Sequence, residues 1–275
     1  MFINKNVIEK VMINYWNDLQ NIRKKRPLIH HLMNYVVMND AANITLAVGA
    51  SPIMAHAREE VEELASRADV VYINIGTLDD RWIESFILAG KAASRNNVPV
   101  LLDPVGAGAT RLRTETTLKI LNEVEVSVLK GGNGGEMMAL AGVSGMVKGV
   151  DSLGEASPEV AEKLAREYGV TAVITGGPRD YVSDGRRTAI VSNGTPMLQY
   201  ITGSGCMVGS VIAGFMAVNR DFLIASVEGL VTFEVAAEKA EKRSFGPASL
   251  KVNLVDELYN MKPDDYELAR VEFKE

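Results

Sequence analysis

The sequence predicts a three-layer α/β/α fold around a mostly parallel central sheet with antiparallel edge strands. Segments with helical periodicity alternate with short, continuous apolar runs, a pattern typical of parallel strands buried on both faces. Later in the chain, Asp184-Gly185 and Asn193-Gly194 separate short strand-like segments, and both dipeptides favour tight hairpin turns. The 275 residues show no internal repeat and no linker, so we expect residues 1–275 to form a single domain.

Helices are expected where apolar residues recur with the period of a helix. Their ranges are 7–24, 38–48, 58–67, 78–96, 115–123, 136–140, 158–168, 206–218, 222–242 and 246–260. Strands are expected at short apolar runs over residues 51–54, 70–75, 98–102, 124–129, 171–175, 180–183, 187–191 and 197–201. Helices separate the first five strands, which should be parallel, whereas the last three follow turn signals and should be antiparallel.

Composition excludes several classes of protein. The net charge is -6 and no basic run is present, so we expect no nucleic-acid partner, and any phosphate must be held by local groups. A single cysteine cannot form an intrachain disulfide, and the N-terminus has no signal-peptide pattern, so a cytoplasmic location is expected. The longest apolar stretch, residues 206–218, is shorter than the ~20 residues that span a bilayer, so no membrane segment is expected.

Loops rich in small residues follow several of the expected strands. Ligands of open α/β sheets bind beyond the carboxyl ends of the strands, so these loops predict a nucleotide site at one rim of the sheet. The most informative loop is Thr202-Gly203-Ser204-Gly205-Cys206, which leads into a helix. Its backbone N–H groups and the helix dipole can cradle a phosphate, or the loop can be a tight turn that allows close helix packing.

Four side chains near this rim are candidates for chemistry, each with a structural alternative. Cys206 at a helix start could be a thiolate that acts as a base or orients a hydroxyl, or a small core residue. Asp103 could hold a metal or steer a hydroxyl, or cap the turn before Pro104. Lys130 could supply charge to a phosphate, or be solvated. Glu136 could lie near Mg²⁺ through water, or complete a helix cap with Asn133.

Two other features are weaker. His30 and His31 are adjacent and would face opposite sides of an extended segment, and no third histidine or second cysteine lies nearby, so a zinc site is not expected. Met54 could line an apolar pocket or fill the core.

Several segments closely resemble the hydroxyethylthiazole kinase family of the ribokinase-like superfamily, and the resemblance runs nearly end to end. The segments that carry it are Asn34-Tyr35-Val36-Val37, Gly49-Ala50-Ser51-Pro52-Ile53-Met54-Ala55, Asn74-Ile75-Gly76-Thr77-Leu78, Leu102-Asp103-Pro104-Val105-Gly106-Ala107-Gly108-Ala109-Thr110 and Thr202-Gly203-Ser204-Gly205-Cys206. The resemblance implies transfer of phosphate from ATP, with Mg²⁺, to the alcohol of 4-methyl-5-(2-hydroxyethyl)thiazole in thiamine biosynthesis or salvage. It also implies a homotrimer with active sites between subunits.

The resemblance assigns a role to each candidate residue. The substrate would contact Met54, Gly203 and Asn34. ATP would contact Lys130, Thr175 and Asn133. Magnesium would lie near Glu136 and Asp103, and the catalytic residues would be Cys206, Gly205 and Asp103.

Two departures from the family pattern leave alternatives open. The family has Arg-Gly-Asn where this chain has Lys130-Gly131-Gly132-Asn133, so the register of the loop is open, and lysine lacks the bidentate fork of arginine. Met33 replaces a threonine that is common before Asn34.

Two alternatives to the implied function stay open: a kinase for another small alcohol, and a nucleotide-binding module without catalysis.

Overall fold

A computed structural model describes residues 13–132, 134–142 and 157–274. Nine strands belong to one sheet: β1 (Leu28–Leu32), β2 (Ser51–Met54), β3 (Val70–Asn74), β4 (Val100–Asp103), β5 (Val128–Gly132), β6 (Thr171–Thr175), β7 (Asp180–Ser183), β8 (Thr188–Val191) and β9 (Val271–Lys274). Their order is β2-β1-β3-β4-β5-β6-β7-β8-β9. Strands β1 to β6 pair in parallel, and β7, β8 and β9 add antiparallel pairs at one edge, as the sequence predicts.

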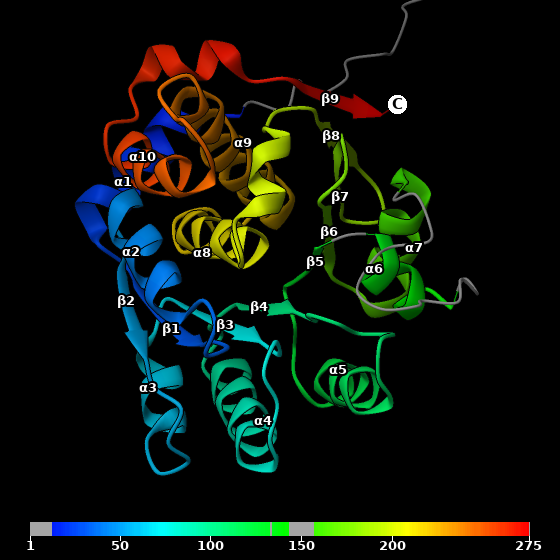
Figure 1. Cartoon of the computed structure of the whole chain (residues 1–275). Helices are drawn as coiled ribbons and strands as arrows, with labels where there is room; N and C mark the ends of the chain where they lie inside the picture. Colours follow the sequence, from blue (N-terminus) through cyan, green and yellow to red (C-terminus); the bar gives the residue numbers. More distant parts are fainter. Residues whose placement is uncertain (1–12, 133, 143–156, 275) are drawn as a thin grey trace, which may run out of the picture.

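Helices cover both faces of the sheet (Figure 1). The first half of the chain supplies α1 (Tyr15–Lys25), α2 (Met38–Val48), α3 (Val61–Arg67), α4 (Asp80–Arg95) and α5 (Arg111–Glu123). The second half supplies α6 (Gly134–Leu140), α7 (Pro158–Tyr168), α8 (Ser204–Met216), α9 (Phe222–Glu241), α10 (Pro247–Tyr259) and two 3-10 helices, η1 (Pro196–Tyr200) and η2 (Pro263–Leu268). Within the described residues, no helix is long and apolar enough to cross a membrane.

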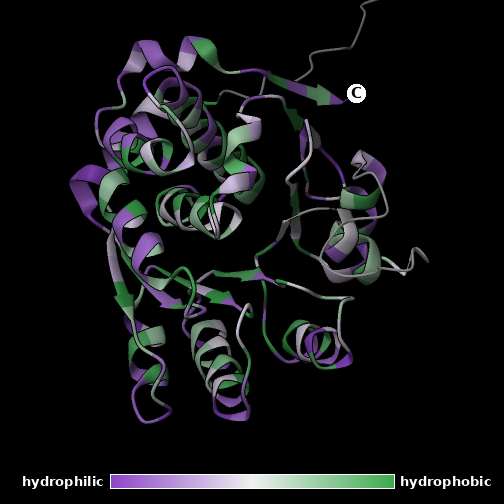
Figure 2. Ribbon diagram, in the orientation of Figure 1, coloured by the Kyte–Doolittle hydropathy of each residue, from purple (hydrophilic) through white to green (hydrophobic). Residues whose placement is uncertain are grey.

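The side chains of each strand alternate between two separate cores. Tyr72 and Leu101 face the core shared with α1, α2, α8, α9 and α10. Their neighbours Val71 and Leu102 face the core shared with α3 to α7. Figure 2 shows hydrophobic residues on the strands and on the inner sides of the helices. The central strands are therefore buried on both faces, which explains their continuous apolar sequences.

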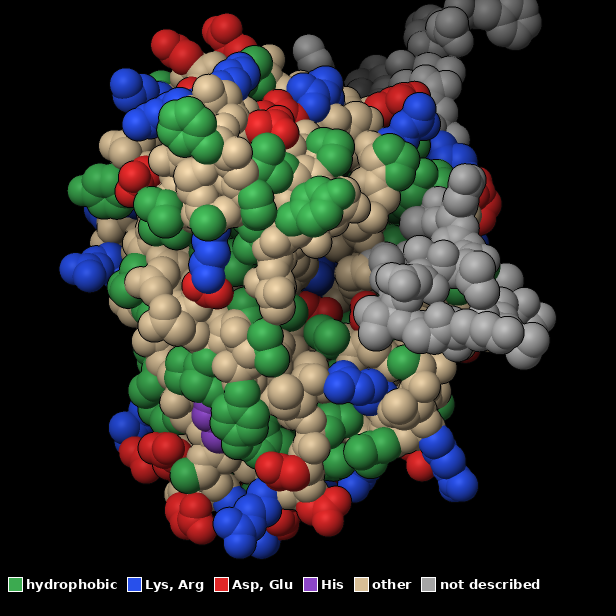
Figure 3. Space-filling model, viewed as in Figure 1, with side chains coloured by type: hydrophobic (Ala, Val, Ile, Leu, Met, Phe, Trp, Pro, Cys, Tyr) green, Lys and Arg blue, Asp and Glu red, His purple; other side chains and the backbone are tan. Residues whose placement is uncertain are grey.

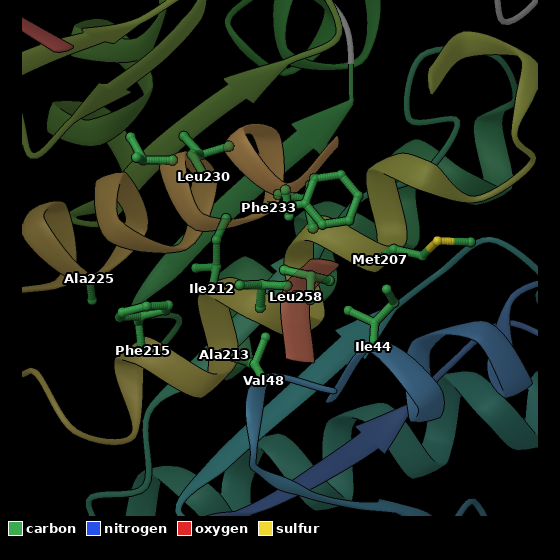
Figure 4. Packing of buried hydrophobic residues seen from close by; sticks show 14 of the residues in the cluster. Ile44, Val48, Met207, Ile212, Ala213, Phe215, Ala225, Leu230, Phe233 and Leu258 are labelled. Atoms are coloured by element: carbon green, nitrogen blue, oxygen red, sulfur yellow. The ribbon is translucent and has the colours of Figure 1, made fainter. Parts of the chain in front are cut away.

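Helix α8 is the most deeply buried helix beside the rim of the sheet. Every residue from Cys206 to Met216 is buried, between α2, α9 and the sheet (Figure 4). Small residues allow this close approach: a Cβ atom at Gly209 would lie 2.3 Å from the Tyr72 hydroxyl oxygen. The start of α8 is thereby fixed against β3 and β4.

Several predicted boundaries are wrong, each for a local reason. The sequence predicts a strand at 197–201, but residues 196–200 form η1, because Pro196 lacks an N–H and the Thr195 side chain accepts a hydrogen bond from the Met197 N–H. The third antiparallel strand is β9, which the sequence analysis missed together with β1. The strand expected at 124–129 begins later and includes Lys130. Helix α1 is confirmed from Tyr15, and residues 7–12 lie outside the described residues.

Candidate active site

Most of the predicted site residues lie at the carboxyl ends of the parallel strands, beside the start of α8. Asp103 ends β4, Lys130 lies in β5, Thr175 ends β6, Gly203 directly precedes α8, and Gly205 lies in the first turn of α8. Figure 3 shows this face of the molecule hollowed near its centre. The topology thus brings together residues that are separated by up to a hundred positions in the sequence.

Asp103 is the centre of a buried polar network. Its Oδ2 accepts hydrogen bonds from the Tyr72 hydroxyl at 3.0 Å, the Asn74 amide at 3.1 Å and the Lys130 ammonium at 3.3 Å. Its Oδ1 is buried and has no partner within the described part of the chain. Burial raises the pKa of Asp103, and the three donors oppose that change. The donors all converge on one oxygen, an arrangement that suits an ionised carboxylate with Oδ1 available to a ligand.

Lys130 is a buried charge rather than a solvated side chain. Its side chain is 1% exposed, and its Nζ donates to the Gly205 carbonyl at 2.7 Å as well as to Asp103. Burial lowers the pKa of Lys130, but the nearby acidic groups, Asp103 first, and the hydrogen bond to Asp103 together outweigh burial and leave the pKa raised. The ammonium therefore adds a positive charge beneath the first turn of α8, where the helix dipole is also positive.

The structure shows which way the side chains at positions 130 and 131 face. Side chains alternate along β5, so the side chain of Lys130 points toward α8 and residue 131 points toward α6. A Cβ atom at Gly131 would lie 2.5 Å from the Met137 sulfur, so this position has no room for a basic side chain. Lys130 is therefore the basic residue of this segment.

Glu136 closes the other side of the site. Its Oε1 accepts a hydrogen bond from the Gly106 N–H at 2.6 Å, and its Oε2 accepts one from the Gly132 N–H at 3.0 Å. Burial and the nearby Asp103 charge raise its pKa to about 7, against the effect of these two donors. A cation would favour the ionised carboxylate. Asn133, its predicted partner in a helix cap, lies outside the described residues.

Cys206 lies in the first turn of α8 and is buried. The Asn34 side-chain amide approaches its Sγ at 3.6 Å, and its carbonyl accepts a hydrogen bond from the Tyr72 hydroxyl. Burial and the charge of Asp103 raise the pKa of the thiol to about 12. Desolvation therefore opposes the thiolate that a helix start is predicted to favour.

Asn34 is held by hydrogen bonds on both sides of its amide. Its Nδ2 donates to Asn74 Oδ1 at 2.7 Å, and its Oδ1 accepts from the backbone N–H groups of Val36 and Val37. The side chain therefore fixes the shape of the segment after β1. Met54, at the end of the neighbouring strand β2, is only partly buried.

Gly203 allows a close backbone contact, whereas Thr175 makes a buried hydrogen bond. Gly203 is the residue before α8 and has φ +79°, and a Cβ atom there would lie 2.4 Å from Val37. Thr175 is buried and its hydroxyl donates to the Gly131 carbonyl at 3.4 Å. Gly203 thus allows close contact between the α8 loop and the segment that carries Asn34.

The sequence analysis missed Tyr72 and Asn74 as members of the site. Tyr72 lies inside an apolar run, where nothing marked it as polar at the rim. Asn74 was visible as a polar residue at the end of that run. His30 and His31 are both buried, and hydrogen bonds join His30 Nε2 to Ala55 and His31 to Ile29 and Ser210.

The surface groove of about 630 Å³ does not belong to this site. It lies at the opposite ends of the strands, next to their amino termini, where Val98, Ser127 and Thr171 line it. None of the predicted site residues lines that groove. Among the described residues, no group of three or more histidine, cysteine, aspartate or glutamate side chains is placed to hold a metal alone.

A family model for the hydroxyethylthiazole kinase family matches residues 19–264. The chain belongs to the hydroxyethylthiazole kinase family. A hydroxyethylthiazole kinase of Caldivirga maquilingensis is 70% identical over 256 residues, which cover 93% of this chain and 96% of the relative. The relative of the same name from Thermoanaerobacter pseudethanolicus is 50% identical, covering 90% of this chain and 94% of its own.

Solved structures agree with this family assignment. The hydroxyethylthiazole kinase protein of Pyrococcus horikoshii superposes with a TM-score of 0.87 at 45% identity, covering 95% of this chain and 99% of its own. Pyridoxal kinase from Staphylococcus aureus, solved with AMP-PCP, has a TM-score of 0.58 at 16% identity and shows the shared ribokinase-like fold alone.

Gly203→Ala tests the close contact in front of α8. We expect it to lower the free energy of unfolding by more than about 1 kcal/mol, because alanine is strained at this φ and its methyl group would overlap Val37. Urea unfolding measures the effect. Gly246→Ala is the control, since φ there is 171° and nothing lies within 4 Å of the added atom. Equal stability of the two variants would contradict the expectation.

The protonation state of Cys206 can be measured directly, because it is the only cysteine in the chain. We expect reaction with iodoacetamide in the free protein to be slow at pH 8 and to rise steadily up to pH 10, because the thiol has a pKa of about 12. Labelling followed by mass spectrometry gives the rate. A rate that reaches a plateau near pH 8 would show that the thiolate forms there after all.

Proposed function

We propose that this protein transfers the γ-phosphoryl group of ATP to the hydroxyl of 4-methyl-5-(2-hydroxyethyl)thiazole, in thiamine biosynthesis or salvage. Membership of the hydroxyethylthiazole kinase family supports the acceptor. The observation that carries the proposal is the Asp103–Lys130 pair buried beneath the first turn of α8. Burial of this ion pair costs desolvation free energy, which a purely structural role would not require. Its position beside the N–H groups of a helix start suits a site for a highly charged phosphoryl group.

The acceptor is proposed to lie between the ends of β1 and β2 and the loop before α8. Met54 and Gly203 would contact the thiazole, and Asn34 would shape the wall beside them. Met54 is partly exposed and apolar, which suits a neutral heterocycle. Gly203 packs against Val37, so the loop and the acceptor wall meet at this point.

The donor is proposed to lie on the other side of α8, over the ends of β5 and β6. Lys130 would supply positive charge near the transferring phosphoryl, and Thr175 and Asn133 would contact ATP. Position 205 supports this placement, because a Cβ atom there would lie 3.4 Å from the Lys130 ammonium. Glycine thus leaves the backbone of this turn without a side chain between it and the phosphate oxygens.

Asp103 and Glu136 fit a magnesium ion bound together with ATP. Asp103 offers a buried oxygen without a partner in the described part of the chain, and burial, followed by the charge of Asp103, raises the pKa of Glu136 to about 7. Both are carboxylates, the ligands magnesium prefers, with water and phosphate completing its shell. When bound, the ion would neutralise charge on the β- and γ-phosphates.

The chain contributes position and electrostatics to the reaction. The hydroxyl oxygen forms a bond to the γ-phosphorus while the bond to the β–γ bridging oxygen breaks and ADP leaves, and the hydroxyl proton passes late to an oxygen of the transferred phosphoryl group or to water. The N–H groups at Gly205 and the α8 start would stabilise the transferring group. Cys206, as a neutral thiol, would orient the hydroxyl rather than remove its proton early.

A coupled kinase assay with ATP and Mg²⁺ tests the function. We expect turnover of the thiazole alcohol, and little with hydroxymethylpyrimidine or simple sugars. Cys206→Ala should keep measurable activity, because no strong base is needed, and Cys206→Asp should be active. Lack of thiazole turnover would reject the proposed acceptor, and tight ATP binding without any transfer would favour a non-catalytic nucleotide-binding module. A folded but inactive Cys206→Asp would count against the role of residue 206.

We also propose a homotrimer with active sites between subunits, in the cytoplasm. Large apolar side chains are exposed on α2, η1 and α10, which adjoin one another: Leu46, Tyr200, Val252 and Tyr259. Figure 3 shows hydrophobic side chains gathered on this face. Such a patch suits contact with another copy of the chain.

Light scattering tests the assembly. We expect a mass of three chains of 29.8 kDa each, and a smaller assembly when Val252→Glu places a charge in the patch. Glu272→Gln, on the distant strand β9, is the control and should keep the trimer. A monomer in the unchanged protein would reject the proposal.

A further inference from the structure

We propose that His56, Trp82 and Tyr35 form an aromatic brace that positions the segment 33–37, and that His56 is a positioning residue for the acceptor alcohol. The brace means these three side chains and their contacts. The inference rests on the proposed function, which places the acceptor beside this segment. None of the three residues takes part in the buried network around Asp103.

The brace holds the segment 33–37 from outside at two points. The Met33 N–H donates to His56 Nε2 at 3.2 Å, and the Trp82 indole N–H donates to the Tyr35 hydroxyl at 3.1 Å. The Tyr35 N–H also donates to the Thr77 hydroxyl at 3.2 Å. Asn34 lies between these anchored residues, so its position follows theirs.

The three rings form one continuous array, in which His56 stacks on Trp82 and Tyr35 is tilted against it. The rings of His56 and Trp82 are 4.1 Å apart with an interplanar angle of 25°, and those of Tyr35 and Trp82 are 4.8 Å apart at 58°. Trp82 is 6% exposed and packs edge-on against Phe86 within α4. The indole is therefore fixed by α4 and restricts the movement of the His56 and Tyr35 rings that pack on it.

His56 also links the segment to the opposite wall of the acceptor site. It follows Met54 by two residues, and the intervening Ala55 carbonyl bonds to His30 Nε2 at 2.9 Å. The ends of β1 and β2 are thus connected twice, through His30 on β1 and through His56 in the loop after β2. Loss of the His56 contact would displace the acceptor wall but leave Lys130 and Thr175, on the donor side, in place.

The contact to Met33 requires a neutral imidazole, because Nε2 must accept a hydrogen bond. Burial lowers the pKa of His56 and the charge of His30 lowers it further, whereas the backbone of Met33 and the charge of Glu60 act in the opposite direction, and the net change is a lowered pKa. As the pH falls through this pKa, Nε2 gains a proton and the bond to Met33 is lost. The KM for the acceptor should therefore rise at acid pH while the KM for ATP stays level.

Three variants separate the parts of the brace. His56→Leu removes the hydrogen-bond acceptor for the Met33 N–H, and Trp82→Phe removes the hydrogen-bond donor to the Tyr35 hydroxyl. His56→Gln keeps a hydrogen-bond acceptor at position 56 that does not titrate. We expect the first two to raise the KM for the thiazole alcohol about tenfold, with the KM for ATP within about twofold of the unchanged protein. His56→Gln should stay near the unchanged value and lose the rise at acid pH. The matched control is Trp16→Phe, on α1.

Hydrogen exchange of the amides at 33–37, measured by mass spectrometry without substrate, separates this inference from the proposed function. Exchange should quicken in His56→Leu and Trp82→Phe and stay unchanged in Trp16→Phe. Faster exchange would support the brace even if the unchanged protein fails to phosphorylate the thiazole alcohol. Unchanged exchange, or an equal rise in the KM for ATP and for the acceptor, would overturn it.

Discussion

The buried ammonium of Lys130 is the interaction on which the arrangement of the site depends. It joins the ends of two strands, through Asp103 on β4 and its own strand β5, to the Gly205 carbonyl of α8. An unpaired ammonium at this depth would be strongly unfavourable, so the three elements must keep their mutual positions for the charge to be tolerated. The glycines at 131, 205 and 209 supply the room that this arrangement needs.

Charge in the site is unevenly distributed, and that imbalance suits its proposed ligands. Asp103, Glu136 and Cys206 all have raised pKa values, because burial disfavours their charged forms and each carboxylate opposes its neighbours. Lys130 alone does not neutralise the group. A bound cation would reduce the repulsion between these acidic groups and would stabilise the protein. Binding of the cation and ionisation of the carboxyl groups are therefore linked.

The sequence predicted the parallel half of the sheet well, because strands buried on both faces have continuous apolar sequences, as in residues 70–75 and 171–175. It failed where a strand carries functional side chains: β1 contains His30 and His31, and β5 contains Lys130. It also failed at η1, where local capping outweighed an apolar pattern. For the site, the residue types were predictable from the loops and the family resemblance. The burial that keeps Cys206 neutral depends on contacts between distant elements, which no local pattern records.

The antiparallel edge has a consequence for how the chain reaches its native state. Strand β8 ends at Val191, whereas its outer partner β9 begins at Val271. During synthesis, the hairpin of β7 and β8 is therefore complete long before its outer edge is covered, and α9 and α10 emerge in the interval. Until β9 arrives, β8 presents unpaired N–H and C=O groups that another nascent chain can pair with. Pairing of β9 with β8 thus removes an exposed strand edge that could otherwise lead to aggregation during synthesis.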